Sequence, residues 1–281
     1  MNNSIETITS LQNPKVKEVT ALQSSSSLRR EKGLFVVEGR REMERCMESG
    51  FALRSLFYCP SVCPQPQVPL SEGARVFEVS AAVYGKMAYR GGTEGILAVV
   101  RGDVRDRSLE ALDRILYGGS GTGDSTGPLI AVVESVEKPG NLGAMLRTAD
   151  GAGVSAVIIC DPHTDLYNPN LIRSSLGGVF TRNIAVCTSS EAIAWLKSRE
   201  VRIITAQLQD SELYYDTDMT GGTALVFGTE STGLSDAWRQ AADAHVRIPM
   251  LGAIDSLNVS VSMAVLCYEA LRQRKISHHA K

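Results

Sequence analysis

Short apolar runs alternate with stretches of helical periodicity in the N-terminal third of the chain, and turn-forming residues separate them. Asn13 and Pro14 predict a helix start, with Asn13 as the N-cap and Pro14 at the first helical position. Ser24 to Ser27 predict a loop. Strands are expected at 34–39, 53–58, 75–79 and 95–100, and helices at 42–49 and 81–88. This alternation is typical of a small α/β domain.

From Pro128 onward the apolar runs are nearly continuous, which is typical of parallel strands covered on both faces. Strands are expected at 129–136, 156–160, 183–187, 201–206 and 224–227. Helices are expected at 142–151, 170–176, 191–198, 236–242 and 257–274. The pattern predicts a second α/β domain with a mostly parallel sheet. The glycine fingerprint of dinucleotide-binding folds is missing after its first strand.

A junction separates the two patterns and ends in a glycine-rich tract at 118–127. Gly118, Gly123 and Ser125 have the spacing of a phosphate-binding loop, but Asp124 stands where the lysine should be and would repel phosphate. We therefore interpret the tract as a flexible linker or surface loop. The expected organisation is a first domain at 1–105, a linker at 106–127 and a second domain at 128–281.

The amino-acid composition argues against several classes of protein. The 281 residues include 29 Lys and Arg against 31 Asp and Glu, so only a local basic face could meet nucleic acid. No apolar run approaches the roughly 20 residues that span a bilayer, and the N-terminus lacks a secretory pattern. The six cysteines are scattered, and Cys59 and Cys63 have no second ligand pair nearby. We expect a cytoplasmic protein with no metal site and no membrane partner.

Three stretches carry residues suited to chemistry, and the first follows the first strand of the second domain. Gly143 and Ala144 let the backbone run close to a neighbour, and Arg147 has a forked donor suited to phosphate. Asn141 and Arg147 both reach the carboxyl edge of the sheet if Asn141 lies in the loop before the helix. The alternative for Arg147 is a surface salt bridge.

The other two stretches follow later strands. Gly228, Glu230 and Gly233 succeed a buried strand, where Gly228 permits close backbone approach and Glu230 could accept from a ligand; a tight turn with an exposed carboxylate is the alternative. Ser256 and Asn258 precede the last helix, and only one of them can be its N-cap. The other either faces a site or is a spare polar residue.

In their order and spacing, these stretches closely resemble the SpoU (TrmH-like) branch of the SPOUT RNA methyltransferases. The motifs are N-x-G-A-x-x-R-T-A, L-V-x-G-x-E-x-x-G-L and I-P-M-x-x-x-x-x-S-L-N-V-S-V, and the resemblance covers about 128–275. Phe35 to Gly39 is similar to the small ribosomal-protein-like substrate-binding domain that precedes many members.

The resemblance implies an α/β fold with a deep trefoil knot, a homodimer packed through the knot, and S-adenosylmethionine as cofactor. The implied catalytic and supporting residues are Asn141, Arg147, Glu230, Ser256 and Asn258. The implied cofactor contacts are Gly228, Ile248 and Leu257, with Thr205, Ala206, Thr229 and Met250 as neighbours. Arg173 matches an RNA-contacting position, and we expect RNA to be held there and by Arg29, Arg30, Lys32, Arg40 and Arg41. A solvated mixed-charge surface is the alternative for these last residues.

The activity implied is transfer of a methyl group to a ribose 2′-hydroxyl of RNA. The added N-terminal domain favours ribosomal RNA by analogy, with transfer RNA as the alternative substrate. A catalytically silent RNA-binding assembly factor is a second alternative, disfavoured by the intact set of catalytic residues. An ordinary nucleotide-binding enzyme is disfavoured by the missing phosphate motifs.

Overall fold

The computed structural model describes residues 5–66, 68, 71–89, 94–102, 106–118, 127–181, 183–229 and 231–279, with side chains as far as 275. The chain divides into two compact units. The N-terminal unit comprises Met1–Arg105 and Asp165–Thr181, and the C-terminal unit comprises Asp106–Thr164 and Arg182–Lys281.

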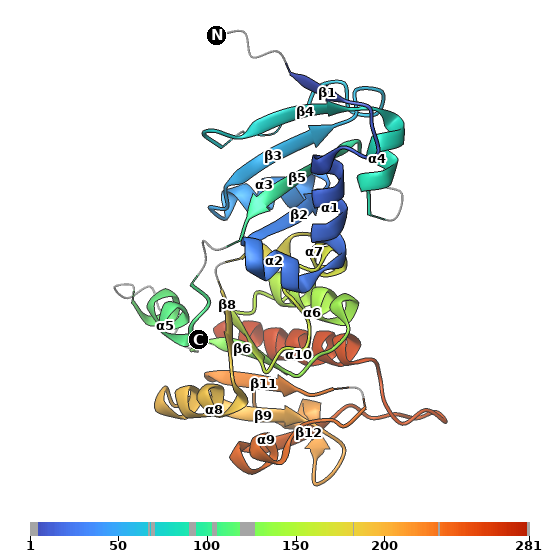
Figure 1. The fold of residues 1–281 in the computed structure, drawn as a ribbon. Coiled ribbons are helices and arrows are strands. Elements are labelled where there is room, and N and C mark those ends of the chain that lie inside the picture. Colours follow the sequence, from blue (N-terminus) through green and yellow to red (C-terminus); the bar gives the residue numbers. More distant parts are fainter. Residues whose placement is uncertain are drawn as a thin grey trace. The chain divides into compact units, whose positions relative to one another are not determined.

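The N-terminal unit is built on a five-stranded mixed sheet (Figure 1). Its strands, in spatial order, are β1 (Glu6–Ile8), β4 (Arg75–Val79), β3 (Leu53–Tyr58), β5 (Ile96–Arg101) and β2 (Leu34–Glu38). Its first helices are α1 (Pro14–Ser24), α2 (Ser26–Lys32), α3 (Arg40–Glu48) and α4 (Ala81–Met87). Strand β5 is antiparallel to both of its neighbours, whereas β3, β4 and β1 run parallel. Helix α1 buries Val16, Val19 and Leu22 in a core cluster with side chains of the sheet.

The segment Asp165–Thr181, with α7 (Pro169–Ser174) and the 3-10 helix η1 (Gly178–Phe180), packs into the N-terminal unit. The ring of Tyr167 stacks on Phe35, with centroids 4.2 Å apart and planes 7° from parallel. Arg29 is only 4% exposed and its Nε lies 2.5 Å from Oδ2 of Asp165. These buried contacts join the segment to strand β2 and helix α2, which are more than a hundred residues earlier in the sequence.

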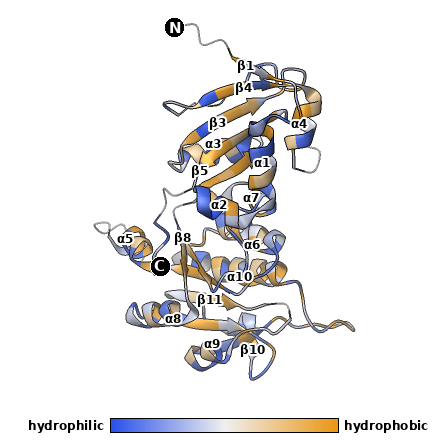
Figure 2. Ribbon diagram, viewed as in Figure 1, coloured by the Kyte–Doolittle hydropathy of each residue, from blue (hydrophilic) through white to orange (hydrophobic). Residues whose placement is uncertain are grey.

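The C-terminal unit is built on a seven-stranded sheet in which every neighbouring pair is parallel. Its strands, in spatial order, are β10 (Glu212–Leu213), β12 (Ala244–Arg247), β9 (Arg202–Ala206), β11 (Thr223–Phe227), β6 (Leu129–Glu134), β7 (Ala156–Cys160) and β8 (Ile184–Cys187). Its helices are α5 (Leu109–Tyr117), α6 (Pro139–Gly151), α8 (Ser189–Ser198), α9 (Asp236–Ala241) and α10 (Val259–His279), with the 3-10 helix η2 (Tyr214–Asp216). The central strands β6 and β11 are buried along their length and consist mainly of hydrophobic residues, as Figure 2 shows for β11. The sheet and helices α5, α8 and α9 share one core cluster.

Two sets of hydrogen bonds hold helices α10 and α8 of this unit in place. Arg274 of α10 is buried, and its guanidinium donates to the backbone carbonyls of Gly127, Pro128, Met219 and Gly221. Helix α8 begins with a capping box, in which Thr188 Oγ1 accepts from the backbone of Glu191 and the Glu191 carboxylate accepts from the backbone of Thr188.

The expected fold class is confirmed: the chain is α/β, with a mostly parallel sheet in the second unit and a smaller α/β unit before it. Strands β3, β4 and β7 have the predicted bounds. The loop predicted at Ser24–Ser27 is wrong, because Ser25 alone separates α1 from α2 and caps the start of α2 through its side chain. The short strands β1, β10 and β12 were not predicted.

The linker expected at 106–127 contains helix α5, whose Leu112 is buried in the core of the C-terminal unit. Residues 119–126 of the glycine-rich tract lie outside the described residues. Within the described part of the chain, no helix is both long and apolar enough to cross a bilayer. The same residues contain no group of three or more His, Cys, Asp or Glu placed to hold a metal ion.

Candidate active site

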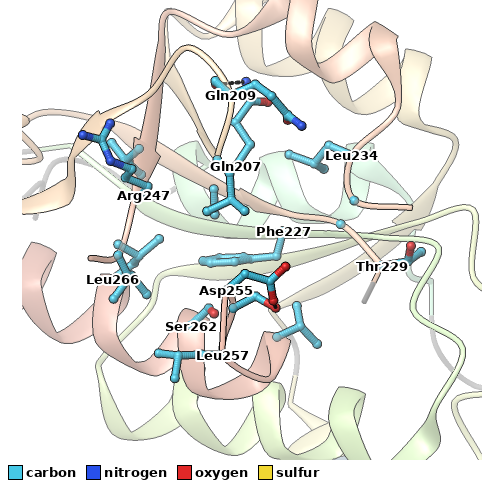
Figure 3. A pocket seen from close by; sticks show the side chains of 18 of the residues that line it. Gln207, Gln209, Phe227, Thr229, Leu234, Arg247, Asp255, Leu257, Ser262 and Leu266 are labelled. Atoms are coloured by element: carbon cyan, nitrogen blue, oxygen red, sulfur yellow. Dashed lines mark hydrogen bonds between the residues drawn. The ribbon is translucent and has the colours of Figure 1, made fainter. Parts of the chain in front are cut away.

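The C-terminal unit contains a cavity of about 550 Å³ at the carboxyl ends of strands β9, β11 and β12. Residues of three loops surround it, at 207–209, at 228–229 with 231–234, and within 248–258, and the start of α10 closes one side. Figure 3 shows loop side chains such as Gln207 and Asp255, together with Phe227 at the end of β11, gathered around the cavity. Ligands of parallel α/β sheets bind at this edge, because the loops that follow the strands converge there.

Gly228 gives one wall of the cavity a shape that no other residue would allow. A Cβ atom on Gly228 would lie 2.3 Å from the backbone carbon and oxygen of Gly233. The turn that follows Gly228 is closed by two reciprocal backbone hydrogen bonds between Thr229 and Gly233, of 3.1 and 3.2 Å. Gly233 itself has a φ of +70°, which favours glycine. The two glycines of the motif are therefore required for different reasons: Gly228 because a Cβ atom has no room, and Gly233 because of its backbone conformation.

The lining combines apolar surface with buried polar atoms that bond to no described residue. Phe227, Leu234 and Leu266 are buried and line the cavity. Gln207 Oε1 and Arg239 Nε are buried and have no hydrogen-bond partner among the residues that the structure describes. Buried polar atoms are nearly always paired, so these two are suited to contacts with a bound polar molecule.

The loop before α10 resolves which of the two polar residues caps the helix. Asn258 is the cap, because its Oδ1 accepts from the backbone N–H of Ser260 at 3.0 Å. The Nδ2 of Asn258 donates to Oδ1 of Asn141 at 3.3 Å, so the first and third motifs meet. Ser256 lines the cavity, and its Oγ donates to Asp255 at 3.3 Å. One polar residue therefore holds the helix and the other faces the cavity.

The first motif is arranged differently from the expectation. Helix α6 begins at Pro139, so Asn141 lies in its first turn and not in the preceding loop. Arg147 is six residues further along the same helix, a rise of about 9 Å. It is exposed, and its side chain has no hydrogen bond or ion pair with any described residue. Asn141 and Arg147 therefore do not meet within one chain.

Most residues expected to contact the cofactor line this one cavity: Ala206, Gly228, Thr229, Ile248, Met250 and Leu257. Thr205 does not line it; it is fully buried, and its Oγ1 lies 2.6 Å from Nδ1 of His245. Glu230 lies outside the described residues, although its neighbours Thr229 and Ser231 line the cavity.

Sequence reasoning did not identify Gln207, Arg239 or Asp255. Gln207 directly follows strand β9, and the rule that ligands bind at the carboxyl ends of strands could have found it. Arg239 comes from helix α9 and carries no such signal.

The basic residues expected to hold RNA all lie in the N-terminal unit, in different environments. Arg29 is unsuited to that role, because its guanidinium is buried and bonded to Asp165 and to the carbonyls of Leu22 and Gln23. The others include exposed Arg30, Lys32, Arg40, Arg41 and Arg173, of which Lys32 is ion-paired to Glu18 and Arg41 to Glu42.

Arg173 lies within electrostatic reach of Glu38. Burial raises the pKa of Glu38, while the hydrogen bond from the Tyr89 backbone and the charge of Arg173 act in the opposite direction.

Comparison with known proteins identifies two families along the chain. Residues 128–268 match the SpoU rRNA Methylase family, and residues 13–98 match the MRM3-like substrate binding domain. The chain is 30% identical to a 23S rRNA (uridine(2479)-2′-O)-methyltransferase of Streptomyces viridochromogenes over 93% of its own length and 91% of that protein.

Solved structures share both units. An RNA 2′-O ribose methyltransferase is 36% identical, with a TM-score of 0.80, and the match covers 96% of this chain and 99% of that one. An rRNA methyltransferase from Sinorhizobium meliloti with bound AdoMet is 27% identical, with a TM-score of 0.79 and coverage of 95% and 98%.

Proposed function

The chain belongs to the SpoU rRNA methylase family, and we propose that it transfers a methyl group from S-adenosylmethionine to a ribose 2′-hydroxyl of ribosomal RNA. The observation that carries the proposal is that the second and third motifs line one cavity, where Asn258 of the third motif donates a hydrogen bond to Asn141 of the first. The similar proteins named above are RNA or rRNA methyltransferases over nearly the whole length of this chain, which supports RNA as substrate.

The cavity has the size and chemistry for S-adenosylmethionine. Its volume of about 550 Å³ falls within the range of small-molecule sites. Apolar side chains such as Leu234 and Leu266 suit a base, and Gln207 Oε1 and Arg239 Nε offer an acceptor and a donor that no described residue uses. Gly228, Ile248 and Leu257 would hold the cofactor, with Ala206, Thr229 and Met250 around them. When bound, the cofactor supplies a methyl group activated by the positive charge of a sulfonium.

The chain's own task is to prepare the acceptor hydroxyl, which is a weak nucleophile until it loses its proton. Arginine side chains in proteins do not give up their proton, so an arginine is a poor choice of general base. We propose instead that Arg147 orients the ribose and a neighbouring phosphate through its forked donors. This orientation places the hydroxyl for in-line attack. The bond between Asn141 and Asn258 fixes the starts of helices α6 and α10 next to that position.

Transfer of labelled methyl from S-adenosylmethionine to RNA from cells lacking the protein tests the proposal. We expect label in the ribosomal fraction, mapped to a ribose 2′ position. Label confined to the transfer RNA fraction would favour the alternative substrate. Neither label nor cofactor binding would favour the assembly-factor alternative.

Arg147→Lys tests the role of the arginine. Lysine keeps the charge and loses the fork, so turnover should fall at least a hundredfold while the calorimetric affinity for S-adenosylmethionine is kept. Arg114→Lys, at an exposed position of helix α5, is the matched control. Normal turnover in the Arg147 variant would refute the assignment.

The proposal includes a homodimer packed through the C-terminal unit, with the knot that the resemblance implies. Apolar side chains near the cavity support it, because Leu251 is 100% exposed and Ile254, Val261 and Tyr268 are also exposed. A second copy would cover this surface and bring its own groups to the exposed Arg147. Sedimentation equilibrium tests this arrangement, and a monomer at micromolar concentration would contradict it. A crystal structure would trace the knot.

We further propose that residues 1–105 form the RNA-binding domain, that RNA is held by Arg30, Lys32, Arg40, Arg41 and Arg173, and that the protein acts in the cytoplasm. The match of 13–98 to a substrate-binding family supports this assignment. Arg40→Glu with Arg41→Glu should weaken RNA binding and leave cofactor binding unchanged. Unchanged RNA affinity across salt concentrations would contradict it.

A further inference from the structure

The N-terminal unit contains a second cavity, of about 350 Å³, between helix α1 and the sheet. Four of its lining residues are cationic, namely Lys15, Arg54, Arg75 and Arg101, and the one carboxylate among them is Glu18. The whole chain has a net charge of −2, so this concentration of positive charge is a local feature.

Strand register explains why these residues meet. Ser55 of β3 is opposite Arg75 of β4 on one side and opposite Val99 of β5 on the other. Arg101 is two residues beyond Val99 and so points to the same face of the sheet. The Cα atoms of Arg75 and Arg101 are then about 12 Å apart. Two long side chains can reach one group across that distance.

The charges of the cavity are only partly neutralised within the protein. Lys15 Nζ lies 2.8 Å from Glu6, and Glu18 accepts from both Lys32, at 3.0 Å, and Arg54, at 3.2 Å. Burial acts to raise the pKa of Glu18, but these two hydrogen bonds outweigh it and the pKa is lowered. Glu18 is therefore charged at neutral pH and is shared between two cations.

Arg75 and Arg101 are the uncompensated pair. Neither side chain has a hydrogen bond or ion pair to any residue in the described ranges, and both are exposed. Like charges held around one cavity repel, and a bound anion removes that repulsion.

We propose that this cavity binds phosphate of the RNA backbone, an inference that rests on the proposed function for its choice of RNA. Arginine forks bind phosphate through two parallel hydrogen bonds. Phe57 and Phe77 line the floor but are 2% and 3% exposed, so they offer no ring face for a base to stack on. The contact is therefore to the sugar–phosphate chain, independent of sequence, and it positions the substrate.

Arg75→Gln with Arg101→Gln tests the site in the full-length protein. Two lost phosphate contacts should lower the magnitude of the salt slope of RNA binding by roughly 1.4 to 1.8. With that slope, affinity for a 23S rRNA transcript should fall roughly tenfold at 200 mM salt and roughly seventyfold at 50 mM. The matched control is Lys17→Gln with Lys86→Gln, which removes two exposed charges of the same unit outside the cavity and should bind RNA nearly as the wild type does.

Glu18→Gln should change RNA affinity in the opposite direction. Removing this carboxylate frees Arg54 of the cavity for the anion, so RNA affinity should rise severalfold and the salt slope should steepen. A charge effect of opposite sign cannot come from damage to the fold. Weaker RNA binding by the Glu18 variant would overturn the proposal, even if the double arginine variant failed to fold.

Methyl transfer by the wild type separates this site from the proposed function. If the wild type methylates RNA while the double arginine variant binds it with unchanged affinity and salt slope, the cavity assignment is wrong and the function stands. If the variant binds RNA weakly as expected but the wild type methylates none, the function is wrong and the site stands. Calorimetric binding of pyrophosphate that is lost in a variant with normal RNA affinity would assign the cavity to a free anion, which also overturns the proposal.

Discussion

Gly228→Ala is the substitution that most directly tests the shape of the candidate cofactor cavity. The added Cβ would meet the carbonyl carbon and oxygen of Gly233 at 2.3 Å and the backbone nitrogen of Leu234 at 2.6 Å. These are backbone atoms, so no change of rotamer can relieve the clash. The turn from Thr229 to Gly233 must open, and the two hydrogen bonds that close it must lengthen.

The size of the effect follows from the cost of an unaccommodated methyl group. Overpacking a well-packed site typically costs about 1–3 kcal/mol. Thr229 and Gly233 both line the cavity, so the displaced turn changes the site itself. If the strain is relieved there, affinity for S-adenosylmethionine should fall roughly 5- to 150-fold. If it is borne by the whole unit instead, the free energy of unfolding should fall by the same 1–3 kcal/mol.

Calorimetric titration with S-adenosylmethionine and urea unfolding measure these two outcomes side by side. Gly252→Ala is the matched control, because a Cβ there meets nothing within 4 Å and the residue lies in another loop of the same site. It should leave both quantities near the wild type. Wild-type affinity together with wild-type stability in the Gly228 variant would refute the reasoning.

Three further predictions concern the stability of the C-terminal unit. Arg274→Met removes a buried donor from four backbone carbonyls, of which those of Pro128 and Gly221 keep a hydrogen bond from Thr223, and it should lower the free energy of unfolding by about 2–4 kcal/mol in urea; a loss under about 1 kcal/mol would contradict the role assigned to this residue. Thr188→Ala removes the cap hydroxyl of α8 and should cost about 1 kcal/mol, with Ser190→Ala as the control. The hydrogen bonds from Thr188, backbone first, lower the pKa of Glu191 below 4.5, so its carboxylate stabilises the helix above that pH. The stability gap between wild type and Glu191→Gln should therefore narrow as the pH falls from 5 to 3, and a constant gap in thermal melts would contradict this.

The fold was predictable wherever burial is continuous along a segment. Strands β3, β4 and β7 are bounded by turn residues and have the expected limits. The three unpredicted strands lack a continuous buried run: β10 has two residues, β1 has three, and only Val246 of the four residues of β12 is buried. The predicted loop between α1 and α2 was too long, since Ser25 alone both ends the first helix and caps the second.

The candidate site was predictable as far as parallel strands force loops together. The motif residues around Gly228 and Ser256 meet for that reason. Arg239 enters from a helix and leaves no periodic signal. Arg29 was expected at an RNA surface because sequence cannot show its partner Asp165, 136 residues away. Long-range pairing of a charged side chain is decided by packing, which local sequence does not encode.

The segment Asp165–Thr181 has a consequence for anyone who divides this protein. It lies within the stretch that matches the methylase family, yet its contacts are with the N-terminal unit. Dividing the chain at the glycine-rich tract would place Phe35 on one fragment and its ring contacts Tyr167 and Phe180 on the other. Each half would then carry an apolar surface that its own residues cannot cover. A chimaera that exchanges substrate-recognition modules between relatives must therefore transplant two pieces of sequence, the N-terminal stretch and residues 165–181, as one part.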